Sequence, residues 1–292
     1  MRIRSLKSVL ALSCGLLSMV ASAGAQEDKA LNLKPFADAD HVIYFPTNIT
    51  AKRTVPSKAN ISYHGGPVIT SAKLVFIFYG PSFANAASAD HTYATTLQAF
   101  RNQFGTTGEY NTITQYSGIQ LTNLGSGGAD WFDTSTPPTN VTDSTVRAEV
   151  NRYFSGGHGT YNSSTIYEVV IPSSSYSSSG SSTSCGGPSL AYCAYHGHFS
   201  GSSGDVKYSI EPYPSCSGCK VSGWSNVQNQ EHFVCHETRE AVTDPDLNAW
   251  FDSVGNEADD KCAWSPSPFI GTNGYGYQYE WSNANGGCVR TR

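Results

Sequence analysis

The sequence predicts an α+β protein with a mixed β-sheet flanked by helices and a loop-rich, disulfide-bearing C-terminal third. Three observations support this prediction. Segments with strand and helix patterns alternate in the order β-α-β-α-β-β-β-α along residues 73–245, which is typical of a sheet covered by helices. The chain begins with the pattern of an export signal. Apart from Cys14, the cysteines lie in the last 110 or so residues, which indicates a loop-rich, disulfide-bearing C-terminal third.

The N-terminal segment has the three parts of a secretory signal peptide. Arg2, Arg4 and Lys7 form a basic start, residues 8–21 are mostly apolar, and small residues precede position 26. The apolar run is too short to be a strong membrane-spanning helix. We therefore expect cleavage near Ala25, a secreted product (extracellular or periplasmic), and no membrane attachment afterwards.

The remaining chain is expected to contain one globular domain. Residues 26–60 carry few helix or strand signals and predict an extended N-terminal arm, whereas 61–292 has the patterns of a single domain. Only 14% of the residues are charged and the formal net charge is −5. An acidic chain of this kind lacks the basic surface of a nucleic-acid-binding protein, so we expect no nucleic-acid partner.

The first half of this domain predicts a buried strand followed by a helix. Residues Lys73–Tyr79 are β-branched and aromatic, which is typical of a central strand. Residues 88–105 have apolar positions at helical spacing and a glycine at the end. The other segments predicted here are a strand at 113–123, a loop at 125–140, and a helix at 141–157 with Asp143 or Ser144 as its N-cap.

The second half predicts three strands and a long helix. Residues 164–172 form a strong strand pattern, and two more strands are expected at 190–199 and 206–214. Between them, the serine-rich residues 172–189 predict a flexible surface loop. The third helix is expected at 225–245, where Pro245 ends it.

Four segments form a series: YHGGPVIT (63–70), KLVFIFYG (73–80), CAYH (193–196) and CSGC (216–219). In this order they resemble the phosphate-induced or EXORDIUM-like family of secreted proteins, over about residues 63–219. The segments HETREAVTDP and NEADDKC resemble microbial members, whereas the plant form lacks this His-Glu helix. The resemblance implies secretion and a carbohydrate-rich setting, but no agreed activity, so the helix is interpreted from its own chemistry.

The third helix carries an HExxE motif whose charged residues share a face. On a helical wheel, His236, Glu237 and Glu240 fall within an arc of about 100° centred near Phe233. Carboxylates on a partly buried face need a counter-charge, because burying an unpaired charge costs several kcal/mol or more. A metal ion would supply it, since side chains four residues apart on a helix can reach one ion.

We therefore predict a divalent-metal site with His236, Glu240 and Glu257 as ligands. Glu237 is the candidate catalytic residue, because the same position in zincins holds the general base. The elements are compatible with a zincin-like arrangement. Zinc is the expected ion, and the carboxylate in place of a second helix histidine also makes manganese or calcium plausible.

The third ligand has alternatives. Asp246 stands where metzincins place theirs, but Pro245 intervenes, and both methionines fall in the signal peptide, which excludes a Met-turn. Glu257 and Asp260 follow a glycine-containing turn that can return them to the helix, and we prefer Glu257. In a purely structural alternative, His236 and Glu240 hydrogen-bond along the helix and Glu237 pairs with Lys261.

Seven cysteines follow the signal peptide, and an exported chain is expected to oxidise them. The expected disulfides are Cys216–Cys219 or Cys185–Cys193, with Cys262–Cys288 stapling the C-terminal region and Cys235 as the free thiol. A zinc site formed by Cys193, His196, Cys216 and Cys219 has nearly the spacing of a zinc ribbon and is the less favoured alternative.

Two functions follow from these observations. The first is a secreted metal-dependent hydrolase of peptidase type, acting on an unknown peptide or cell-wall polymer through a solvent-open cleft over Glu237. The second is a non-catalytic secreted protein of a cell wall or surface, in which the same helix face is packed and dry. The sequence identifies no substrate for either function.

Overall fold

The computed structural model describes residues 37–38, 41–44, 46 and 58–292. The predicted signal peptide (1–25) lies outside the described residues, as does most of the predicted arm. The compact unit that contains the described residues spans 32–292. Its helices, mixed sheet and three disulfides confirm the predicted α+β class.

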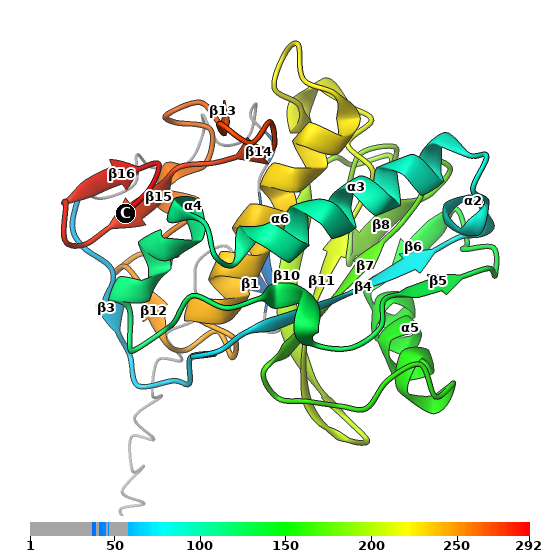
Figure 1. Cartoon of the computed structure of the whole chain (residues 1–292), viewed down its shortest axis with the longest axis horizontal. Helices are drawn as coiled ribbons and strands as arrows, with labels where there is room; N and C mark the ends of the chain where they lie inside the picture. The colour runs from blue at the N-terminus through cyan, green and yellow to red at the C-terminus, as the bar shows by residue number, and fades with distance from the viewer. Residues whose placement is uncertain (1–36, 39–40, 45, 47–57) are drawn as a thin grey trace, which may run out of the picture. The chain divides into compact units, whose positions relative to one another are not determined.

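A seven-stranded sheet, in the order β1-β2-β10-β11-β7-β4-β5, organises this unit (Figure 1). β11, β7, β4 and β5 run parallel, and the pairs β10–β11, β2–β10 and β1–β2 are antiparallel. The strands are β1 (Ala37–Asp38), β2 (His41–Tyr44), β10 (Ala194–Gly201), β11 (Gly204–Glu211), β7 (Thr165–Val170), β4 (Lys73–Tyr79) and β5 (Trp131–Asp133). The sheet is therefore mixed, as expected.

Helices cover both faces of this sheet. α3 (Ala89–Phe104) and α6 (Asn226–Thr243) contact each other on one face, and α5 (Asp143–Ser155) packs on the other. Successive strand residues point to opposite faces. On β4, for example, Phe76 packs in the core under α3 and α6, whereas Val75 packs in the core under α5.

Local signals in the sequence account for the helix ends. Ser225 caps α6 through a reciprocal capping box with Gln228, and the helix ends at Thr243, two residues before Pro245. Ser88 caps α3 by accepting a hydrogen bond from the backbone N–H of Asp90. The N-cap of α5 is Thr142, one residue before the predicted Asp143, because its hydroxyl accepts from the N–H at position 145.

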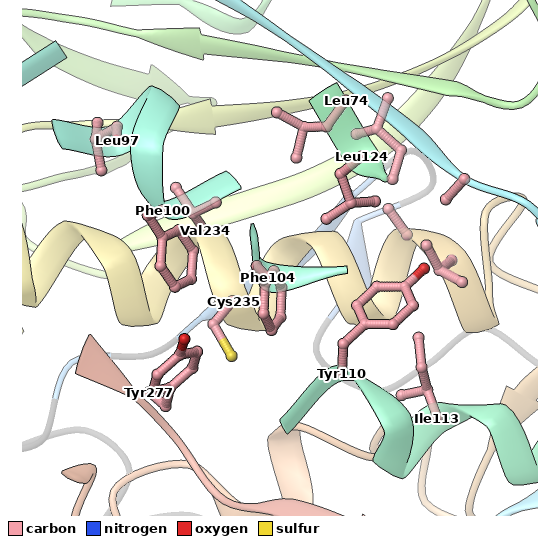
Figure 2. Close-up of a cluster of buried hydrophobic side chains, with 14 of the residues drawn as sticks. Leu74, Leu97, Phe100, Phe104, Tyr110, Ile113, Leu124, Val234, Cys235 and Tyr277 are labelled. Atoms are coloured by element: carbon pink, nitrogen blue, oxygen red, sulfur yellow. The ribbon is translucent and has the colours of Figure 1, made fainter. Parts of the chain in front are cut away.

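The core between α3, α6 and the C-terminal segment is rich in aromatic rings. Figure 2 shows Phe100 and Phe104 on α3, with Tyr277 nearby and the sulfur of Cys235 among the rings. Cys235 is buried and is the free cysteine of the described residues, as predicted. Burial of these side chains fixes α6 between the sheet and the C-terminal strands.

Smaller elements connect the main ones. The short helices are α2 (Pro81–Ala84), α4 (Gly108–Asn111), η1 (Thr112–Gln115), η2 (Leu124–Ser126), η3 (Ser217–Cys219) and η4 (Asp260–Cys262). The short strands are β3 (Ser62–Tyr63), β6 (Asn140–Thr142), β8 (Tyr176–Ser179), β9 (Ser182–Thr183), β12 (Trp250–Phe251), β13 (Phe269–Ile270), β14 (Gly276–Tyr277), β15 (Glu280–Ser282) and β16 (Gly287–Val289).

Two predictions for the first half are corrected. Residues 113–123 are not a strand but part of the 3-10 helix η1 and irregular backbone, in which Ile113 and Ile119 are buried against the core. The predicted loop at 125–140 contains β5, which extends the sheet beside β4. Ile113, Tyr116 and Ile119 are thus buried without strand pairing.

The serine-rich segment is also more ordered than predicted. β8 and β9 pair within a three-stranded sheet, and Ser177 and Ser184 are wholly buried. The Ser184 hydroxyl accepts from the Ser177 backbone N–H at 2.9 Å, and the Ser177 and Tyr192 hydroxyls are hydrogen-bonded. These bonds satisfy buried polar atoms, so the segment packs as part of the domain.

The prediction that the exported cysteines form disulfides is confirmed, and the pairing is corrected. The bonds are Cys185–Cys216, Cys193–Cys219 and Cys262–Cys288. Only Cys262–Cys288 was predicted with its partner. Cys216 and Cys219 each bond to a distant cysteine because η3 lies beside the segment that leads into β10.

Candidate metal centre

The helix that carries the HExxE motif is enclosed on all sides. Every residue from Asn229 to Thr243 is buried, including Arg239. Arg239 pairs with Asp259 and Glu280, and all three side chains are 0% exposed. A wholly buried ion-pair group of this kind indicates that α6 is a central element and not a surface helix.

The sheet presents polar side chains to the motif. On β10, His196 points toward α6, whereas its neighbour Tyr195 packs in the core on the opposite face. Glu168 on β7 and Glu211 on β11 also meet α6, through Thr238 and Gln230 respectively. Acidic and imidazole groups are therefore sandwiched between sheet and helix, where apolar residues usually pack.

Four short distances define the candidate centre. His196 Nδ1 lies 3.1 Å from Glu237 Oε2 and 3.6 Å from Glu240 Oε2. His236 Nε2 lies 3.1 Å from Glu240 Oε2. The backbone N–H of Asp260 donates to Glu240 Oε1 at 3.0 Å. Glu240 is therefore the residue at which the helix, β10 and the loop before η4 meet.

Two triads of side chains have the separations of metal ligands. One is His236, Glu240 and Asp260, and the other is His196, Glu237 and Glu240. In each triad the candidate ligand atoms all lie within 4.8 Å of one another, and all these residues are buried. Because Glu240 belongs to both triads, an ion held by either one depends on its carboxylate.

The surroundings of His236 orient its ring for coordination. Its Nδ1 lies 3.2 Å from Gln278 Oε1, and Gln278 Nε2 donates to the backbone oxygen and the Oδ1 of Asp259. The Gln278 oxygen can only accept, so the proton sits on Nδ1 and leaves Nε2 toward Glu240. Such a partner on the far nitrogen is typical of histidines that bind metals.

Polar atoms at the centre lack hydrogen-bond partners among the described residues. They are His236 Nε2, Glu237 Oε1 and Glu240 Oε2. The nitrogen and the Glu240 oxygen face each other at 3.1 Å, close to the ~3.3 Å between two ligands of a tetrahedral zinc ion. Because an unsatisfied buried charge is costly, these atoms fit a bound cation.

The acid groups raise one another's pKa. Burial raises the pKa of Glu237 well above its ordinary value, and the nearby Glu240 raises it further. Burial also raises the pKa of Glu240, to about 7, although His236 opposes this. For His236, burial lowers the pKa, but Glu240 outweighs that effect and raises it to about 9. A proton shared between His236 and Glu240 is thus the alternative to a cation.

Asp260, the alternative third ligand, lies with His236 and Glu240, whereas Glu257 lies beside His196. Glu257 is wholly buried on another side of the centre, where its Oε2 lies 3.8 Å from His196 Nε2. The turn into η4 explains the position of Asp260, since it brings the N–H of Asp260 to the Glu240 carboxylate.

Two other sequence candidates lie elsewhere. Asp246 forms an ion pair with Lys207 on β11, in a partly exposed group outside the two triads. Lys261, which the structural alternative paired with Glu237, instead pairs with Asp252 at 3.1 Å. Pro245 turns the chain away from the helix axis, which removes Asp246 from the HExxE face.

His196 is the residue of the centre that was not among the predicted ligands. The sequence singled it out only within the cysteine-histidine zinc alternative. Cys193 and Cys219 form one disulfide and Cys216 joins Cys185 in another, so those sulfurs cannot serve as thiolate ligands in this structure. The position of His196 beside α6 depends on long-range sheet pairing, which no local pattern in the sequence indicates.

Glu168 provides a test of the buried acids that lie under α6. Thr238 Oγ1 donates to Glu168 Oε1 at 2.8 Å, and burial raises the Glu168 pKa to about 8. An acid with a raised folded pKa contributes stability that is complete below its unfolded pKa and is lost as pH rises through the folded value. Glu168→Gln removes this titration. As pH rises from ~5 to ~8, the unfolding free energy of the variant should therefore increase relative to that of wild type, by up to roughly 1.4 kcal/mol per pH unit.

Urea unfolding at several pH values measures this gain. Gln120→Ala at an exposed position is the control, and its stability curve should run parallel to that of wild type because no titratable group is removed. Parallel curves for Glu168→Gln as well would contradict the raised pKa.

Comparisons with known proteins add no family to these observations: no protein-family model, curated protein or solved structure matches the chain. The resemblance to EXORDIUM-like proteins and the zincin-like arrangement therefore stay predictions. Across the described residues, no helix combines the length and apolar character needed to cross a membrane.

Proposed function

We propose that this chain is a secreted protein that binds a divalent cation between α6 and β10. The observation that carries the proposal is the shared position of Glu240. Its Oε2 faces His236 Nε2 at 3.1 Å, neither atom has a hydrogen-bond partner among the described residues apart from the other, and both side chains are buried. His236, Glu240 and Asp260 would hold the ion, with the His196–Glu237 pair beside it.

Zinc fits this donor set better than calcium or manganese. The structure brings a second imidazole, His196, to within 3.6 Å of the Glu240 carboxylate. Imidazole together with carboxylate suits zinc, whereas calcium prefers ligand shells made of oxygen atoms. The buried surroundings also restrict the number of waters that could complete a larger coordination shell.

The hydrolase function of peptidase type is proposed for the same centre. A bound divalent ion would lower the pKa of a coordinated water. Glu237 would accept the proton, because its Oε1 is free of hydrogen bonds from the described residues and a bound cation beside it would favour the ionised carboxylate that a base requires. His196 would orient Glu237 through the 3.1 Å contact to Oε2.

The non-catalytic alternative is favoured by one specific observation. Glu237 is 0% exposed, so the described conformation has the packed and dry helix face that this alternative expects. In that case the ion stabilises a cell-wall or surface protein and no water is activated. A catalytic role requires a second conformation in which this face opens.

Glu237→Gln separates the two functions. The amide is isosteric and Glu237 is absent from the His236 triad, so bound zinc should stay near one equivalent and the melting temperature should change little. Cleavage of a peptide library should fall by at least about 100-fold, the usual contribution of a general base. The control is a substitution of a different residue on the same helix, Gln230→Ala. This variant should keep cleavage within a few-fold.

Metal content and peptide cleavage are measured on the same preparations. If wild type cleaves no peptide under any condition while it holds its ion, the non-catalytic alternative is correct. If Glu237→Gln loses the ion, Glu237 is a ligand and the assignment of the His196 triad replaces that of the His236 triad.

A further inference from the structure

A short strand from the N-terminal part of the chain lies along the edge of β10. β2 pairs with β10 in antiparallel register, from Tyr44 opposite Ala194 to His41 opposite Gly197. The pair between Val42 and His196 brings this strand directly past a residue of the candidate centre. Edge strands present a row of backbone donors and acceptors, and an added strand satisfies them.

The side chain of Tyr44 lies over the centre. Its ring stacks on the His236 ring with 4.1 Å between centroids and on the Trp264 ring with 5.3 Å. His232 and Phe233 meet it edge-on. Tyr44 is 0% exposed, so an aromatic side chain from the arm fills an aromatic pocket that has a candidate metal ligand as one wall.

The phenol hydroxyl is not satisfied in this pocket. Tyr44 OH is buried and has no hydrogen-bond partner among the described residues. A buried hydroxyl without a partner is unfavourable, so the pocket selects the ring and not this hydroxyl.

We propose that the β10 edge and this aromatic pocket form a binding groove for an extended peptide with an aromatic side chain, and that residues 41–44 occupy the groove in cis. Strand addition supplies affinity through main-chain hydrogen bonds and specificity through side-chain pockets. A tethered segment competes at a high effective concentration, so β2 excludes external peptides. The inference deepens the proposed function by naming its substrate class, but the groove needs no ion to exist.

The test displaces the arm in the full exported chain. Alternate N–H groups of a strand face its neighbour, so prolines at both 42 and 43 remove a ladder hydrogen bond whichever residue donates it. Val42→Pro with Ile43→Pro is therefore the test variant. Val42→Ala with Ile43→Ala is the matched control, because it keeps both N–H groups.

The probe is a fluorescently labelled peptide with the sequence of residues 37–46, ADADHVIYFP. Anisotropy titrations are made with chelator and with added zinc. The proline variant should bind this peptide at least tenfold more tightly than the alanine control. Replacing the tyrosine of the peptide by alanine should weaken binding by at least tenfold.

A folded proline variant that binds the peptide no better than the alanine control would overturn the proposal, and so would equal binding of the two peptides. Circular dichroism and disulfide mapping establish folding. If the proline variant does not fold, hydrogen exchange on wild type decides. Amides of residues 41–44 should then exchange well before those of α6, whereas exchange of both only through global unfolding would make β2 a permanent part of the core.

The two proposals fail separately. Peptide binding in chelator without a stoichiometric ion in wild type supports the groove and rejects the metal centre. A stoichiometric ion in wild type, together with a folded proline variant that does not bind the peptide, supports the metal centre and rejects the groove.

Discussion

Replacing Arg239 by methionine is expected to lower the free energy of unfolding by about 3–5 kcal/mol, the usual cost of removing one partner from a buried ion pair. The guanidinium pairs with Asp259 and Glu280, and all three side chains are wholly buried. Without Arg239, these two carboxylates are left uncompensated in the core. Urea unfolding of purified protein measures the change.

The control for Arg239 is Arg147, whose ion pair with Asp143 on α5 is partly exposed. Arg147→Met should cost less than about 1 kcal/mol, because solvent screens pairs of this kind. Adding Asp259→Asn and Glu280→Gln to Arg239→Met should restore part of the lost stability, since no buried charge then remains unpaired. A loss below about 1 kcal/mol for Arg239→Met alone would contradict this account of the α6 core.

Replacing Glu240 by glutamine is expected to abolish the bound ion, because Glu240 is the residue common to both triads. The amide keeps the shape of the side chain and its acceptor for the Asp260 N–H, but it lacks the charge that attracts a cation. Loss of an ion present at 100 times its dissociation constant removes about 2.7 kcal/mol of stabilisation. Metal analysis and thermal melting are made on the same sample.

Glu231→Gln is the matched control for Glu240→Gln. Glu231 is a buried glutamate of the same helix that lies outside both triads, and its Oε2 accepts from the Gly276 N–H at 2.7 Å. This variant should keep its ion. His236→Ala and His196→Ala then identify the triad, since the proposed ligand set predicts that the first loses the ion and the second retains most of it.

The helices and the central strands were predictable because their signals are local. The helix at 225–245 has a capping residue at its start and a proline at its end, and its bounds in the structure are Asn226–Thr243. Likewise, the continuous apolar run Lys73–Tyr79 has the bounds of β4. Segments that are buried without regular pairing carry no such signal. For this reason residues 113–123 were predicted as a strand, and the serine-rich segment as a flexible loop.

The candidate centre was predictable only on the helix. His236, Glu237 and Glu240 share a face through helical spacing alone, and the structure brings all three into the two triads. His196 joins them through long-range sheet pairing, which places β10 beside β11 under α6. The choice of Asp260 over Glu257 depends on the turn before η4. Neither feature follows from a spacing rule, which is why the helix motif alone identified only part of the two triads.

The divalent-cation centre is the central claim, and the metal content of the purified exported protein tests it most directly. The account predicts about one zinc per chain by elemental analysis. It also predicts that a chelator removes the ion and lowers the melting temperature by at least about 5 °C, given ~2.7 kcal/mol of ion stabilisation. Protein that carries no stoichiometric divalent ion, with a melting curve that chelator leaves unchanged, would contradict the claim.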